Sequence, residues 1–190
     1  LFELVEGRLF YSYEDVVIDD VSTGPGVPGF IQEVERIISK VGLTLTRDTR
    51  DSILFPTEGN ILSLRKEFAG GPFGGEADYG RLELQGAQFF KTSETMEQVL
   101  SFVARAGTLG RFDGTDANVP FFERFFLGGP YNLRGWDYRD VGPLDASEPT
   151  GGHSFLYLGG EYTFKIAQPL RLAIFYDGGY LNKEDFDFDP

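Results

Sequence analysis

Charged side chains that could take part in chemistry stand close together in the segment TRDTRDSILFPTEGN of this 190-residue chain. Arg47, Asp48, Arg50 and Asp51 combine carboxylates with guanidinium groups, an arrangement that could serve acid–base catalysis. Charges at this spacing more commonly pair with each other at a solvated strand end, and we favour that interpretation. His153 is the only histidine and cysteine is absent, so the sequence shows no nucleophile beside a base. We therefore expect a protein that is not an enzyme.

Two further segments could hold a ligand. Residues 70–76 (GGPFGGE) are rich in glycine, but the Lys-Ser/Thr pair of a phosphate-binding loop is missing and no helical pattern follows. A hairpin loop is the better interpretation. The acidic segment 183–190 (KEDFDFDP) could bind calcium, although carboxylates without a fixed geometry rarely make a tight site, and an exposed loop is favoured. We expect no metal site and no cofactor.

The most unusual segment is 119–143, VPFFERFFLGGPYNLRGWDYRDVGP. It has neither the period of a helix nor the alternation of a strand, and its glycines and prolines require repeated turns of the backbone. A loop with so many aromatic residues would be costly to leave in water. We therefore favour a loop folded back into a cavity over a surface loop with stray apolar residues. Arg134, in the tight turn Leu133-Arg134-Gly135-Trp136, is its expected anchor.

Composition restricts both fold and function. The 19 Phe, 9 Tyr and 25 Gly, together with short alternating segments, are typical of an all-β protein. A net charge of −13 argues against nucleic-acid binding, because no basic patch is available to replace phosphate counterions. No apolar run reaches the roughly 18 residues of a transmembrane helix, but membrane-spanning β-strands need only about 9–11 residues. The chain begins in mid-pattern without a visible signal peptide, so we expect an internal piece of a longer protein.

Seven segments alternate between apolar and polar residues, as β-strands with two different faces do. These segments are residues 6–18, 41–48, 60–69, 78–91, 98–110, 154–166 and 170–181. Residues 30–39 are ambiguous, because their apolar residues could form one or two helical turns or could begin the next strand. Residues 22–29 (STGPGVPG) are expected to form a loop on composition alone.

The polar faces of these segments carry charges, which decides what the sheet can enclose. The charged residues on those faces are Arg8, Glu14, Arg65, Glu67, Arg81, Glu83, Arg105, Glu161, Arg171 and Asp177. Such a face suits a water-filled lumen and would be costly in a dry core, so the apolar face must meet lipid. Short connections near 56–59, 92–97 and 167–169 alternate with long ones near 19–35, 70–77 and 111–153. This sorting is typical of an outer-membrane barrel with periplasmic turns and extracellular loops. The sequence predicts an all-β transmembrane antiparallel barrel.

The segment FFERFFLGGPYNLRGWDYRDVGP resembles the signature loop of the BamA-type outer-membrane assembly barrels, also called the bacterial surface antigen family. The pattern is aromatic-x-R-F-x-x-G-G, then an aliphatic-R-G-aromatic turn, then G-P. The matching residues are Phe122, Arg124, Phe125, Gly128, Gly129, Leu133, Arg134, Gly135, Trp136, Gly142 and Pro143. Leu133 stands where Val or Ile is usual, and Trp136 where Phe is usual. Upstream, DTRDSILFPTEG resembles a hairpin of the same family.

The resemblance implies a barrel of about sixteen strands, of which this chain would hold roughly the seventh to the thirteenth. Residues 1–190 would then be a partial barrel domain, with the POTRA domains and the remaining strands outside it. Residues 111–153 would be the long extracellular loop, folded into the lumen. The resemblance also implies that Arg134 contacts acidic residues on the two following strands, at the positions of Glu161 and Asp177. Alternation places both acids on the polar face, and a role for them as acid–base catalysts is the weaker reading.

The function that the resemblance implies is an insertase that aids the folding and membrane insertion of β-barrel proteins. Its expected partners are nascent outer-membrane barrel clients, accessory assembly lipoproteins, the lipid bilayer and lipopolysaccharide, and not nucleic acid. Its expected place is the outer membrane of a Gram-negative-type bacterium, with an organelle outer membrane as the alternative. A protein-translocation or secretion barrel of the same superfamily (TamA-like or two-partner secretion) remains open, as does a diffusion porin, which the long loop opposes.

Overall fold

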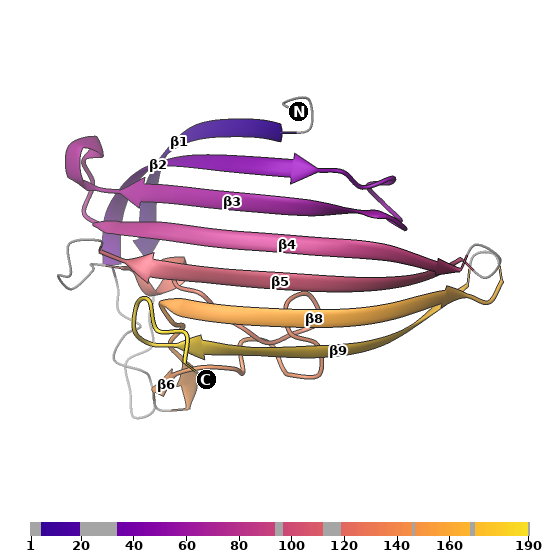
Figure 1. Cartoon of the computed structure of the whole chain (residues 1–190). Coiled ribbons are helices and arrows are strands. Elements are labelled where there is room, and N and C mark those ends of the chain that lie inside the picture. Colours follow the sequence, from indigo (N-terminus) through magenta and orange to yellow (C-terminus); the bar gives the residue numbers. More distant parts are fainter. Residues whose placement is uncertain are drawn as a thin grey trace.

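The computed structural model describes residues 5–19, 34–93, 97–111, 119–145, 147–167 and 170–189. One antiparallel sheet of seven strands dominates it, in the order β1-β2-β3-β4-β5-β8-β9 (Figure 1). The strands are β1 (Val5–Ile18), β2 (Val34–Asp48), β3 (Gly59–Ala69), β4 (Tyr79–Ser93), β5 (Gln98–Gly110), β8 (Ser154–Lys165) and β9 (Arg171–Asn182). The smaller elements are the 3₁₀ turns η1 (Gly71–Phe73) and η2 (Phe121–Glu123), and the short ladder of β6 (Leu144–Asp145) with β7 (Glu148–Pro149).

The register of the sheet keeps apolar residues on one face. Leu45 of β2 lies opposite Leu64 of β3, Leu64 opposite Leu84 of β4, Leu84 opposite Ala106 of β5, and Ala106 opposite Leu156 of β8. A slip of one residue in any pair would turn that strand's apolar side chains to the charged face. The alternation in the sequence and the strand pairing in the structure therefore agree at these positions from β2 to β8.

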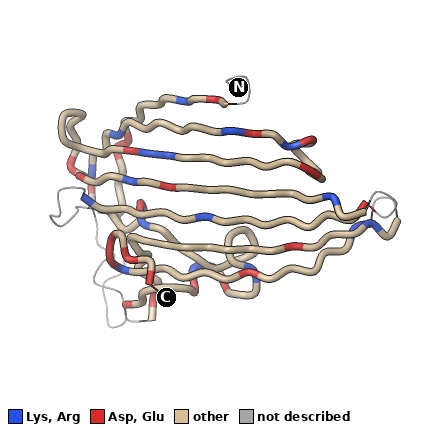
Figure 2. The backbone as a smooth tube through the Cα atoms, in the orientation of Figure 1, with Lys and Arg blue, Asp and Glu red and all other residues tan. Residues whose placement is uncertain are grey.

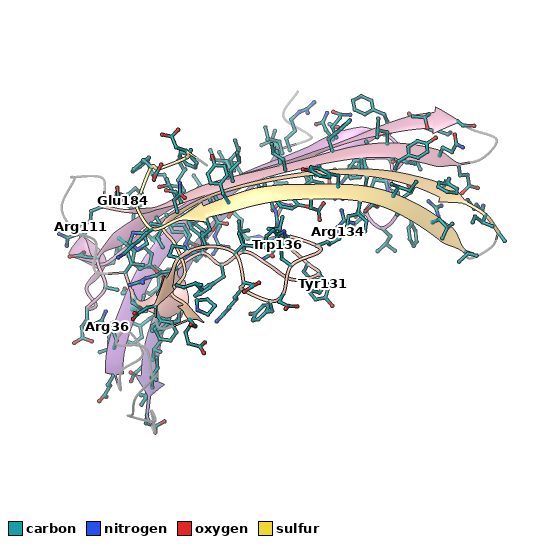
Figure 3. The ribbon with its side chains drawn as sticks, turned by 90° about the horizontal axis from the view of Figure 1, so that it is seen from below. Arg36, Arg111, Tyr131, Arg134, Trp136 and Glu184 are labelled. Carbon is teal, nitrogen blue, oxygen red and sulfur yellow. The ribbon has the colours of Figure 1, made fainter. Side chains whose placement is uncertain are left out.

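The sheet arches, and the loop that follows β5 lies on its concave side (Figure 3). Large apolar side chains are exposed on the opposite, convex face: Leu9, Tyr11, Leu43, Leu45, Leu62, Leu64, Leu84, Phe90, Phe102, Leu158, Leu172, Ile174 and Tyr176. An apolar face of this extent agrees with the lipid-facing side that the alternation predicts. Charged positions occur along the strands and not only at their ends (Figure 2).

The buried core lies between the loop and the concave face of the sheet. Its members include Ile38, Tyr79, Leu109, Val119, Phe125, Leu127, Leu133, Phe155, Tyr157 and Leu181. The rings of Phe125 and Phe155 pack with their centroids 4.7 Å apart, so a loop residue meets a strand residue within this cluster. The loop itself thus supplies much of the apolar surface that the concave face buries.

The all-β antiparallel architecture predicted from the sequence is confirmed. Within the described residues β1 and β9 each pair on one side only, so the sheet is an open section of a barrel wall. Residues 70–76 form the predicted hairpin connection, with η1 at its tip. Among the residues that the structure describes, no helix is long and apolar enough to cross a membrane.

The ambiguous segment 30–39 is resolved in favour of a strand over its described part. Residues 34–39 belong to β2, which pairs with β1 as far as Val34 opposite Ile18. The pairing partner, and not the local spacing of apolar residues, decides this segment. Residues 30–33 and the expected loop at 22–29 lie outside the described residues, as do parts of the expected turns near 92–97 and 167–169.

The acidic segment after β9 forms an exposed loop, as predicted, and folds back over the convex side, where Glu184 lies (Figure 3). The amide of Phe186 donates to Oγ1 of Thr108 at 2.9 Å. The side-chain amide of Asn182 donates to the carbonyl of Asp189 at 2.7 Å. These hydrogen bonds use the backbone of the segment, and Oδ1 of Asp187 accepts a further one from the amide of Asp189 at 3.2 Å.

Candidate functional site

Residues 119–143 form a narrow loop on the concave face of the sheet, with hydrogen bonds between its two arms (Figure 3). The amide of Val141 donates to the carbonyl of Leu127 at 3.2 Å, and the amide of Gly129 donates to the carbonyl of Trp136 at 3.1 Å. At the tip, Asn132 accepts a hydrogen bond from the amide of Gly128 at 2.9 Å. The aromatic segment therefore has internal pairing, which explains how an irregular sequence can hold a fixed shape.

Two signature glycines are required by this shape. Gly128 has a φ of 114°, and a Cβ there would lie 2.2 Å from the carbonyl oxygen of Asp137. Gly142 has a φ of 128°, and its Cβ would lie 2.6 Å from the side chain of Leu181. Since only glycine adopts these angles without strain and leaves this space, both positions follow from the fold of the loop.

The tip of the loop is attached to the sheet by Arg134. Its guanidinium group binds Asp177 of β9 with two parallel hydrogen bonds, from Nε to Oδ2 at 2.7 Å and from Nη2 to Oδ1 at 2.9 Å. Nη1 donates to Oε2 of Glu161 on β8. The guanidinium also lies 3.7 Å from the ring centroid of Phe175. We call Arg134, Glu161 and Asp177 the loop anchor.

Burial and charge make the loop anchor more than a surface ion pair. The side chain of Asp177 is 1% exposed, whereas those of Arg134 and Glu161 are each 29% exposed. The carboxylate of Asp177 raises the pKa of Arg134 above its usual range, and Glu161 adds to this effect. Arg134 is therefore protonated across the physiological pH range. A buried carboxylate held by a bidentate guanidinium fixes the geometry of the loop, because only arginine offers this fork of donors.

A second contact at the tip comes from β5. Arg105 donates from Nη2 to the carbonyl of Asn132 at 3.0 Å, and its guanidinium lies 4.5 Å from the ring centroid of Tyr157. Alternation alone placed Arg105 on the charged face, but nothing in the sequence linked it to the loop. Tyr131 is 97% exposed and points away from the sheet (Figure 3).

The other residues of the signature differ in burial and in backbone conformation. Leu133 is buried in the core, Phe125 packs there, and Phe122 is partly buried against it. Gly129 and Gly135 have φ angles of 104° and 92°. The side chain of Trp136 is 55% exposed, so it lies beside the loop anchor in sequence without being enclosed by it.

Arg124 and Pro143, near the two ends of the loop, both form hydrogen bonds with Thr150. Arg124 donates from Nη1 to the carbonyl of Thr150 at 3.2 Å, and burial lowers the pKa of Arg124. The carbonyl of Pro143 accepts a hydrogen bond from the amide of Thr150 at 3.0 Å. Phe125 and Gly152 exchange backbone hydrogen bonds of 3.0 and 2.9 Å. These contacts close the loop near its entrance.

A cluster of charged residues near that entrance was not expected from the sequence. Glu123, at the end of η2, accepts hydrogen bonds from Lys40 of β2 at 2.9 Å and from Arg81 of β4 at 3.2 Å. Glu123 stands between aromatic residues in FFERFF, and a carboxylate in such a setting needs a buried cation, which was the available signal. Lys40 follows the segment whose structure was ambiguous, so its face could not be assigned.

The charged cluster between β2 and β3 has the geometry of an ion-paired strand end, as we favoured. Arg50 binds Asp48 at 2.7 Å. Asp51 accepts hydrogen bonds from the Thr57 hydroxyl at 2.7 Å and from the amides of Thr57 and Glu58 at 2.8 and 3.1 Å. These hydrogen bonds lower the pKa of Asp51 to about 2. The carboxylates are occupied in shaping the turn.

No group of three or more His, Cys, Asp or Glu in the described part of the chain is arranged to hold a metal ion. The arrangement of charged groups instead supports a structural role: charged hydrogen bonds hold loop 119–143 in a fixed position against the concave face of the sheet.

Comparisons with known proteins agree with this architecture. Residues 8–189 match the Omp85 superfamily domain. The chain is similar to outer membrane protein assembly factor BamA of Nitratidesulfovibrio vulgaris, with 32% identity over 164 residues that cover 83% of this chain and 20% of the relative. It is also similar to the SAM50-like protein SPAC17C9.06 of Schizosaccharomyces pombe, with 31% identity over 145 residues that cover 73% of this chain and 30% of the relative.

Among solved structures, that of BamA from Haemophilus ducreyi lacking POTRA domains 1-3 aligns with a TM-score of 0.73 and 15% sequence identity. The alignment covers 94% of this chain and 39% of that chain, and it shows the shared fold. The chain thus spans between 20% and 39% of the length of these proteins.

Proposed function

The chain belongs to the Omp85 superfamily, and we propose that it is part of an outer-membrane assembly factor that aids the folding and insertion of β-barrel proteins. Its relative in Nitratidesulfovibrio vulgaris bears the name outer membrane protein assembly factor BamA. The described strands are a section of an outer-membrane barrel wall, with the apolar convex face toward lipid. The activity is proposed for the intact protein that contains this wall and its loop.

The observation that carries this proposal is the placement of loop 119–143 on the concave face by Arg134. A diffusion pore requires an open lumen, and a loop held there by charged hydrogen bonds opposes that function. A folding factor has no need of an open channel. The loop anchor instead supports a barrel whose interior is kept in one defined arrangement.

The proposed activity needs no catalytic residue. A β-barrel in lipid satisfies all its backbone hydrogen bonds, so insertion of a client is favourable once its strands have paired. The barrier is the exposure of unpaired strand edges to the bilayer before closure. A protein that lowers this barrier accelerates folding without a cofactor or a chemical step. Nascent outer-membrane barrels are the clients in this scheme, with assembly lipoproteins, lipid and lipopolysaccharide as further partners.

The test is client folding in a purified system. The intact protein, reconstituted in liposomes, receives a urea-unfolded outer-membrane barrel without added nucleotide, and the folded fraction is followed by its resistance to SDS without heating. We expect faster folding than in empty liposomes. Arg134→Ala should slow it, whereas Tyr131→Ala, at an exposed position of the same loop, should not. A folding rate equal to that in empty liposomes would overturn the proposal.

A translocation or secretion barrel of the same superfamily is the second candidate. The concave face also carries charges that pair within the wall, such as Arg65 with Glu67 and Glu83 with Arg81, and these favour it because they would line a polar path for a polypeptide. In that case the liposomes would leave client folding unchanged, and a secreted polypeptide would instead become protected inside them.

A further inference from the structure

Glu123 is an acidic loop residue buried against the wall far from the loop anchor. Its side chain is 10% exposed, and each of its carboxylate oxygens has a cationic partner. Oε1 lies 2.9 Å from Nζ of Lys40, and Oε2 lies 3.2 Å from Nη2 of Arg81. Arg81 Nη2 also donates to the backbone carbonyl of Glu123. Side chain and backbone of one loop residue are thus bound by two strands.

The two cations are themselves held by carboxylates of the wall. Lys40 lies 3.2 Å from Glu14 of β1. Arg81 lies 3.6 Å from Glu67 of β3, whose side chain is 1% exposed, and 3.4 Å from Glu83 of β4. We call Glu123, Lys40, Arg81 and Glu67 the base cluster. The placement of the two cations therefore does not depend on Glu123 alone, because wall carboxylates also hold them.

The base cluster and the loop anchor hold the loop to different parts of the sheet. Glu123 binds β2 and β4, whereas Arg134 binds β8 and β9. In the strand order, β2 and β9 are separated by β3, β4, β5 and β8. At about 4.8 Å between neighbouring strands, this separation is about 24 Å along the sheet. The loop therefore crosses the concave side with one ionic attachment near its start, at Glu123, and another at its tip, at Arg134.

We propose that Glu123 is a positioning residue, which holds the first part of the loop to β2 and β4 independently of the loop anchor. Removal of its charge would leave Lys40 and Arg81 with fewer carboxylate partners in a place where water screens them poorly. The first part of the loop should then open while the tip stays attached through Arg134. The proposal concerns the placement of the loop and stands whatever client the protein serves.

The test is hydrogen–deuterium exchange of the intact protein in detergent or nanodiscs, read by mass spectrometry in two peptides. One covers 119–126, where the amides of Glu123 and Arg124 close η2, and the other covers 127–138 at the tip. Glu123→Gln should speed exchange in the first peptide about tenfold or more, as expected when a charge-assisted hydrogen bond is lost, and leave the second unchanged. Arg134→Ala should show the reverse pattern.

Glu83→Gln is the matched control, because Glu83 is also a carboxylate partner of Arg81, at 3.4 Å, but belongs to β4 and not to the loop. It should leave both peptides at the wild-type rate. Glu123→Asp keeps the charge and should restore part of the protection, which tests whether the ion pairs act and not packing alone. Lys40→Met should speed exchange in the first peptide, less than Glu123→Gln because Arg81 remains.

Four results would overturn the proposal. The first two are an unchanged exchange rate in 119–126 after Glu123→Gln, and an equal rise of the rate in both peptides after that substitution. The other two are a rise after Glu83→Gln as large as that after Glu123→Gln, and an exchange rate in Glu123→Asp as fast as in Glu123→Gln.

Discussion

Arg134→Ala is the perturbation whose effect the structure predicts in most detail. It removes the bidentate pair with Asp177, the hydrogen bond to Glu161 and the contact with Phe175. The carboxylate of Asp177, 1% exposed, would be left without its cation. Breaking a buried pair in this way costs about 3–5 kcal/mol. Because Arg134 is 29% exposed and partly screened by water, we expect a value near the lower end, about 3 kcal/mol.

Because about 1.4 kcal/mol corresponds to a factor of ten, 3 kcal/mol should raise the equilibrium constant for loop opening about 100-fold over that of the wild type. Substitutions at Asp177, at Glu161 and at Arg134 itself should differ in their free-energy cost. Asp177→Ala should approach the cost of Arg134→Ala, while Glu161→Gln should cost about 1 kcal/mol, since one partly buried hydrogen bond is weakened. Arg134→Lys should lie between them, because lysine keeps the charge and loses the parallel pair. Double-mutant cycles should give a larger coupling for Arg134 with Asp177 than for Arg134 with Glu161.

The assay is resistance of the loop to proteinase K in the intact membrane protein, together with complementation of a strain depleted of the wild type. Arg134→Ala, and Glu161→Ala combined with Asp177→Ala, should expose the loop and, under the proposed function, impair barrel assembly. If these variants keep wild-type protease resistance and full complementation, the loop anchor does not hold the loop and the reasoning is refuted.

A Cβ at Gly159 would lie 2.5 Å from the Tyr157 hydroxyl and 3.1 Å from Asp177, whereas one at Gly160 meets nothing closer than 3.8 Å. Gly159→Ala should therefore lower protease resistance of the loop, and the adjacent Gly160→Ala should not. Hydrogen bonds from Thr57 and Glu58 lower the pKa of Asp51 to about 2 from an ordinary 3.8, so its contribution to the turn is present above about pH 4 and lost as the pH falls toward 2. The carboxyl chemical shift should titrate near 2 in the folded protein, and exchange of the turn amides, corrected for the intrinsic rate, should rise with acid in the wild type but not in Asp51→Asn.

The sequence alone determined the strands and their faces. Period-two alternation is a local property, and it correctly put Leu64 and Leu84 on one face and Glu67, Arg81 and Arg105 on the other. It could not resolve residues 30–39, because a short apolar spacing fits a helix or a strand equally well. There the pairing of β2 with β1 decided the outcome.

For the glycines of the signature, too, the sequence shows one part of the explanation and the folded chain the other. Their positions are visible in the sequence as turn signals, but the reason for Gly142 is the side chain of Leu181, which only the folded chain brings near. Trp136 belongs to the signature turn, yet its side chain is largely exposed beside the loop anchor. Residue type predicted where the backbone turns and not what each side chain meets.

Tertiary structure alone decided which charges meet. Asp177 is 43 residues from Arg134, and Lys40 is 83 residues from Glu123. Periodicity assigns each of these residues to a face but contains no information on its distance along or across the sheet. That distance is set by strand register and by the path of a loop, and both depend on contacts among residues far apart in the chain. The family resemblance supplied the pairing of Arg134, whereas that of Glu123 became visible only when β2, β4 and the loop lay together.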